Sequence, residues 1–102
     1  MTEYNLTMAV KSIFLAALLL ISSCASLAPV QEMSNARQTL RLAKVAKAEI
    51  YAQDQYLRAQ ESLDQAVNQL NSGDYHEARR LALQAANEAK QAHLLALNHQ
   101  KK

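Results

Sequence analysis

The four residues Asn71-Ser72-Gly73-Asp74 decide the fold, because they interrupt a chain that is otherwise rich in helix formers. Gly73 supplies the left-handed backbone conformation that commonly follows a helix, and Asp74 can cap the helix that comes next. Asp74 and Glu77 also have the spacing of a capping box, in which Asp74 accepts a hydrogen bond from the N–H of Glu77 and Glu77 reaches back. The segment therefore predicts a turn at 71–74 between two helices.

After the turn, alanines recur at alternating spacings of four and three, which is the rhythm of a helix seam. These alanines, called the alanine seam below, are Ala78, Ala82, Ala85, Ala89, Ala92 and Ala96. Before the turn the same rhythm is kept by Ala52, Tyr56, Ala59, Leu63, Ala66 and Leu70. Small residues let two helix backbones approach closely, so the two seams predict an antiparallel helical hairpin.

Upstream of residue 52 the apolar pattern changes phase. Met33, Ala36, Leu40 and Ala43 follow one phase, whereas Val45, Ala48 and Ala52 follow another. Such a slip is compatible with one continuous helix that has two apolar faces. It is equally compatible with a break near 51–54, where Asp54 could cap a new helix. The first helix is expected to begin near Pro29 or Val30, because proline is favoured in the first turn.

Composition supports an all-α fold and excludes several function classes. The chain of 102 residues has one Gly, one Pro, no Trp and a single Phe, and it has fewer β-branched and aromatic residues than a sheet needs. Its formal net charge of +2 is far from that of a dedicated nucleic-acid binder. A domain of this size has a thin core, so it often relies on an oligomer or an anchor.

The N-terminal segment has the order of a secretory signal. Lys11 precedes the apolar run from Ile13 to Ile21, and two small serines and Cys24 follow. A run of this length is too short for a permanent membrane-spanning helix, which takes about 20 residues. Glu3 is unusual in the basic region of such a signal, so Met8 is expected to be the start of translation.

The tetrad Ile21-Ser22-Ser23-Cys24 resembles the lipobox of bacterial lipoproteins. The resemblance implies cleavage between Ser23 and Cys24, and a diacylglyceryl group and an N-acyl chain on Cys24. It also explains a lone cysteine in an exported chain, since that thiol has no internal partner. The alternatives are an ordinary signal cleaved near residues 25–28 and an uncleaved signal anchor. Ala25 stands where lipoproteins retained in the inner membrane typically carry Asp, so the resemblance favours the outer membrane.

Most of the chain after Cys24 resembles a family of bacterial envelope lipoproteins, catalogued as domain of unknown function 4398. The matching residues are Pro29 with Glu32, Ala36-Arg37, Tyr51-Ala52, Ala59 with Leu63 and Ala66, and Gly73-Asp74-Tyr75 leading into residues 78–82. Family members typically place proline after the Tyr-Ala pair, whereas this chain has Gln53. The resemblance implies a helical envelope protein without an assigned activity.

The remaining candidates for chemistry favour surface roles. No two of His76, His93 and His99 have the i, i+4 spacing of a helical metal-ligand pair, so no metal site is expected. Glu61 and Asp64 lie three residues apart, a spacing more common on solvated helix faces than in acid–base pairs. No phosphate-binding loop or nucleophile motif is present in the sequence. We therefore expect no catalytic residue, no cofactor besides the lipid on Cys24, and no small-molecule substrate.

Together these observations predict three segments: a cleaved lipoprotein signal at 1–23, a lipidated tether at 24–30, and an alanine-rich helical hairpin at 31–102. The hairpin has two long helices, or three if the first breaks near 51–54. The expected role is structural or protein-binding, on the periplasmic face of the outer membrane, toward an envelope protein or a second copy. The alternatives are a peptidoglycan tether through Lys102 and an accessory subunit of an envelope complex.

Overall fold

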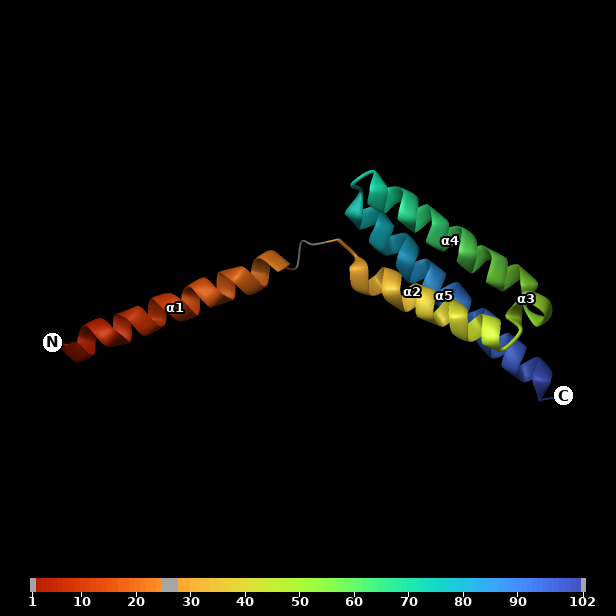
Figure 1. Ribbon diagram of the computed structural model, residues 1–102, viewed down its shortest axis with the longest axis horizontal. Coiled ribbons are helices and arrows are strands. Elements are labelled where there is room, and N and C mark those ends of the chain that lie inside the picture. Colours follow the sequence, from red (N-terminus) through yellow and green to blue (C-terminus); the bar gives the residue numbers. More distant parts are fainter. Residues whose placement is uncertain (1, 25–27, 102) are drawn as a thin grey trace.

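The computed structural model describes residues 2–24 and 28–101, which are helical over most of their length. The helices are α1 (Thr2–Cys24), α2 (Val30–Val45), α3 (Ala48–Tyr51), α4 (Gln53–Asn71) and α5 (Tyr75–Gln100). The all-α prediction is thus confirmed. α1 contacts none of the other helices, so residues 28–101 form the folded unit (Figure 1).

The folded unit is a bundle of three long helices in which α5 packs along both α4 and α2. α4 runs antiparallel to α5, which is the predicted hairpin, and α2 lies beside α5 in the parallel direction (Figure 1). α2 and α4 have little contact with each other. α5 has 26 residues, against 16 in α2 and 19 in α4, so at about 1.5 Å per residue it extends beyond each of its partners.

The turn between α4 and α5 forms as the sequence predicts. Gly73 has a φ of 87°, and its N–H donates to the carbonyl of Leu70 at 3.1 Å. The N–H of Asp74 donates to the carbonyl of Gln69 at 2.9 Å, which completes a Schellman motif. The Asp74 carboxylate accepts from the N–H of Glu77 at 3.1 Å. The second half of the capping box does not form, because the N–H of Asp74 already closes the preceding helix.

The chain upstream of α4 adopts the broken alternative, so three long helices are present instead of two. The break is wider than the predicted 51–54 and begins at Ala46 and Lys47, before the short α3. Lys47 is left-handed, with a φ of 65°, and a second interruption falls at Ala52. The prediction that Asp54 caps a new helix is wrong, because Ala52 occupies the N-cap position and no side chain caps α4.

Alanine provides most of the buried apolar side chains. The chain reverses its direction over residues 46–52, and this segment is called the reversal below. One cluster joins buried residues of the reversal to the C-terminal half of α5, and it includes Leu40, Tyr56 and Ala96. A second cluster at the other end contains Met33, Ala66, Leu81 and Ala82. An alanine methyl buries little area, so the core gains stability from close backbone approach as well as from burial.

Candidate functional site

The expected lipidation segment lies at the end of α1. The backbone of Ile21, Ser22, Ser23 and Cys24 is helical, whereas their side chains lie outside the described part of the structure. Ala25 and the tether residues up to 27 also lie outside it, as does Lys102. Within residues 2–24 and 28–101, no helix combines the length and apolar character that a membrane crossing requires.

The tether joins the bundle at the end that carries the α4–α5 turn. Pro29 is buried at the N-cap of α2, and its carbonyl accepts from the N–H of Met33 at 3.0 Å. One turn later, Glu32 accepts a 3.2 Å hydrogen bond from Arg79 on α5. The reversal at 46–52 and the C-terminal end of α5 lie at the opposite, distal end (Figure 1).

The alanine seam lies along the centre of the bundle. All six alanines have no exposed surface. On α4, Ala59 and Ala66 are equally buried, and Ser62 is the buried polar side chain between them. The faces that α4 and α5 turn toward each other are therefore occupied by packing within the bundle. Any partner must contact the outer faces of the helices or the ends of the bundle.

A polar network crosses from α4 to α5 at Ser62. The Ser62 hydroxyl lies 3.2 and 3.3 Å from the two carboxylate oxygens of Glu88, to which it can donate one proton. The side-chain amide of Gln84 donates to Ser62 at 3.3 Å and to Glu88 at 2.8 Å. Arg58, Glu61 and Gln65 line the same groove. The polar groups of Ser62, Gln84 and Glu88 are thus hydrogen-bonded to one another, so the network fixes the register of α4 and α5.

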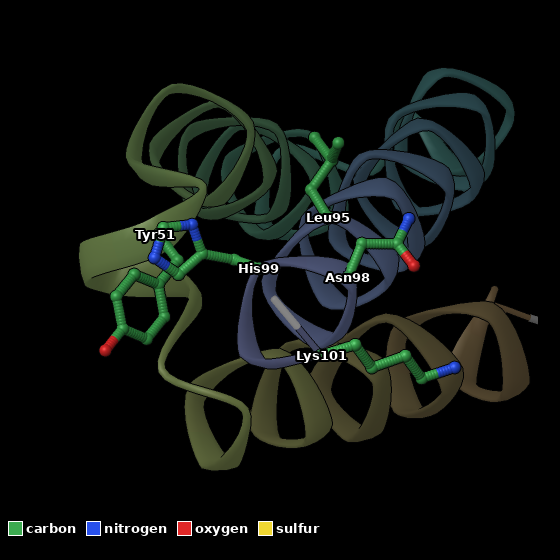
Figure 2. Close-up of a pocket in the computed structure, with 5 residues that line it drawn as sticks. All are labelled: Tyr51, Leu95, Asn98, His99 and Lys101. Atoms are coloured by element: carbon green, nitrogen blue, oxygen red, sulfur yellow. The ribbon is translucent and has the colours of Figure 1, made fainter.

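A shallow hollow lies at the distal end and is larger than the polar groove beside Ser62. Tyr51, Leu95, Asn98, His99 and Lys101 line it. The rings of Tyr51 and His99 stack with centroids 4.2 Å apart. Figure 2 shows that the side chains of Asn98 and Lys101 point away from this stacked pair. The lining residues do not converge on one point, so the hollow suits contact with a surface better than enclosure of a small molecule.

The three histidines are separated and take different roles. His76 is exposed, His99 stacks on Tyr51, and the Nδ1 of His93 lies 3.2 Å from the carbonyl oxygen of Leu42. His93 is partly exposed, and its ring contacts α2 through the Leu42 carbonyl. In the described part of the chain, His, Cys, Asp and Glu side chains nowhere form a group of three suited to a metal ion.

One local ion pair lies on the surface of α5. Arg80 donates to Glu77 one turn earlier on α5, with its Nε at 3.0 Å from a carboxylate oxygen. This hydrogen bond lowers the pKa of the Glu77 carboxyl and raises that of the Arg80 guanidinium. Glu61 and Asp64 are both exposed, and of the two only Glu61 lines the polar groove. The pair therefore has no shared environment for acid–base chemistry.

Two examples show tertiary features that the sequence did not predict. The first is the Ser62, Gln84 and Glu88 network, whose signal in the sequence was Ser62, a polar residue between Ala59 and Ala66. The second is a 2.7 Å hydrogen bond from the side-chain amide of Gln100 to the carbonyl of Ala46, for which the sequence carries no local signal.

Comparison with known proteins places the folded unit in one family. Residues 31–102 match the family described as Domain of unknown function (DUF4398), so the match begins one residue after α2 starts and leaves out α1. No curated protein and no solved structure matched the chain significantly. Because the family match covers well over half of the sequence, this chain belongs to the DUF4398 family.

Proposed function

We propose that the protein is a lipoprotein on the periplasmic face of the outer membrane, anchored through Cys24, with a structural or protein-binding role. The observation that carries this proposal is the separation of α1 from the bundle. α1 contains the apolar run and the lipobox, contacts no other helix and lies outside the family match. Its removal at Ser23 would therefore leave every described helix–helix contact intact.

An anchor at Cys24 would orient the bundle relative to the membrane. The tether enters at Pro29, so the α4–α5 turn would lie on the membrane side and the reversal on the far side. α5 has 26 residues, which corresponds to about 39 Å at 1.5 Å per residue. The distal end would thus be presented roughly that far into the periplasm, where envelope proteins are accessible.

The outer surface supports binding of a protein over catalysis. At the distal end Val45 and Ile50 are 82% and 71% exposed, and the stacked Tyr51 and His99 lie at the same end of the bundle. Exposed large apolar side chains near aromatic rings are typical of protein-binding surfaces. The divergent side chains of the distal hollow give no arrangement of nucleophile and base.

Replacement of the lipid acceptor tests the anchor. Cys24→Ser removes the thiol, so we expect an unprocessed precursor that does not incorporate labelled palmitate and stays at the inner membrane. Ser23→Ala, which keeps a small residue at the cleavage site, is the matched control and should mature normally. Normal cleavage of the Cys24→Ser protein, with release into the soluble periplasm, would show that an ordinary signal peptidase site is used instead.

Fractionation of the mature protein tests its location and its role. We expect it in outer-membrane fractions, and crosslinking in intact cells should recover the envelope partner or a second copy. Release by murein digestion would instead support a covalent peptidoglycan tether. Recovery in inner-membrane fractions would contradict the proposed location.

A further inference from the structure

The reversal at 46–52 is made from residues that favour helix. The sequence from Val45 to Gln53 is Val-Ala-Lys-Ala-Glu-Ile-Tyr-Ala-Gln, without Gly, Pro, Asn or Asp. Lys47 nevertheless adopts a left-handed conformation that lysine rarely takes. The break is therefore imposed by tertiary contacts and not by local preference.

Several of those contacts come from the last turns of α5, and the others come from α2 and α4. Gln100 donates to the carbonyl of Ala46 at 2.7 Å, and His99 stacks on Tyr51. Ala48 and Ala52 are buried in the cluster that contains Ala92 and Ala96. The conformation of the reversal thus depends on α2, α3 and α4 of one chain packing together on the same α5.

The spacing of the seam positions in α2 and α4 can be extended past the break. The buried positions 33, 36, 40 and 43 of α2 extend in the same rhythm to 47, which is a lysine, and to the apolar Ile50. The α4 positions from 70 back to 52 extend to 48 and 45. Val45 and Ile50 therefore belong by spacing to helix seams, yet the reversal leaves them 82% and 71% exposed.

A straight helix over 30–71 would carry both seams on separate faces. With 3.6 residues per turn, the two phases differ by about 140° around such a helix. One α5 cannot cover both faces, whereas two α5 helices from two chains can.

We propose that residues 46–52 straighten and that the protein forms a domain-swapped dimer, in which α2 of each copy packs on α5 of the other. Every contact between α2 and α5 is reproduced between chains, including Glu32 with Arg79 and His93 with Leu42. The helical conformation of Lys47 replaces the left-handed one, and Val45 and Ile50 join their seams. Short strained connections favour this kind of exchange.

Two substitutions at one position test the hinge. Residues 25–102 are used because every described contact between helices lies within the bundle. Lys47→Ile disfavours the left-handed conformation, whereas Lys47→Gly accepts it, and both remove the same charge. After refolding at equal concentrations, light scattering should show a dimer-to-monomer ratio at least about tenfold higher for Lys47→Ile. Equal ratios in two folded variants would overturn the proposal.

A mixed-chain disulfide distinguishes a swapped dimer from other dimers and does not depend on those variants. Cys24 is the chain's single cysteine, so residues 25–102 contain none. One chain carries Glu32→Cys and the other Arg79→Cys, and the two are co-refolded at high concentration without other substitutions. We expect a disulfide that joins positions 32 and 79 of different chains. A single chain that carries both substitutions is the control, because it shows whether cysteines at positions 32 and 79 are placed to form a disulfide. If that control closes and the mixed chains do not, the swapped dimer is refuted.

Discussion

The hydroxyl oxygen of Ser62 on α4 lies 3.2 Å from a carboxylate oxygen of Glu88 on α5. Ser62 is 5% exposed and stands among alanines, so this contact is the polar element of an otherwise apolar interface. Buried hydrogen bonds of this kind contribute modestly to stability and strongly to register, because a shifted helix leaves a polar group unpaired.

We expect Ser62→Ala to lower the free energy of unfolding by about 0.5–1.5 kcal/mol. The alanine fits the space that Ser62 occupies between α4 and α5, but the hydrogen bond to Glu88 is lost. Glu88→Ala and the double variant complete a double-mutant cycle in urea, which should give a coupling energy of similar size. Glu61→Ala, an exposed residue of the same groove, is the control and should be nearly neutral. A cycle without coupling would mean that the contact contributes nothing to stability.

The alanine seam predicts a sharp dependence on side-chain size. Ala85 and Ala89 have no exposed surface, so leucine at either position must push the helices apart. Ala85→Leu and Ala89→Leu should each cost about 1–3 kcal/mol by overpacking. Lys90→Leu keeps helix propensity on an exposed position and should stay within about 0.5 kcal/mol. Gln84 is unsuitable as a control, because its amide donates to Ser62 and Glu88.

Thermal unfolding of residues 25–102, followed by circular dichroism, measures these differences. Wild-type melting temperatures for both alanine variants would show that the seam is not closely packed.

The turn between α4 and α5 and the buried face of α5 were predictable from the sequence, because residues close together in the chain determine them. Gly73 and Asp74 each have a specific backbone role, and both take it in the structure. The spacing of the alanines likewise identified the face of α5 that is buried. In both cases the signal is carried by neighbours in the sequence.

The reversal could not be located, because its causes are distant in the sequence. Lys47 and Ala52 carry no turn signal, and the contacts that hold them come from His99 and Gln100, about 50 residues later. The change of phase between Ala43 and Val45 was visible, but periodicity alone does not show whether a helix breaks or presents two faces. The network at Ser62 depends in the same way on how α4 and α5 align.

The exposed pair of Glu77 and Arg80 predicts a small dependence of stability on pH. Arg80 lowers the pKa of Glu77 in the folded state, so the contribution is fully present above the unfolded value of about 4.5. It is lost as the pH falls through the lowered folded value. The melting temperature of wild type should therefore exceed that of Glu77→Gln at pH 7, and the difference should shrink in acid. A difference that stays constant into strong acid would contradict this assignment.

The turn at Gly73 predicts a penalty that comes from the backbone alone. Gly73 has a φ of 87°, and a Cβ built on it would meet no other atom within 4 Å. Gly73→Ala therefore creates no clash, yet it should cost about 1 kcal/mol, because alanine disfavours the left-handed region. Asparagine tolerates that region better, so Gly73→Asn should lose clearly less.

Urea unfolding of residues 25–102 compares the two Gly73 variants under identical conditions. Both keep the N–H that donates to Leu70, so they differ from glycine mainly in backbone preference. Equal losses for alanine and asparagine would mean that the side chain itself, and not the φ angle, disturbs the turn. Retention of wild-type stability by Gly73→Ala would mean that the chain closes α4 by another conformation in solution.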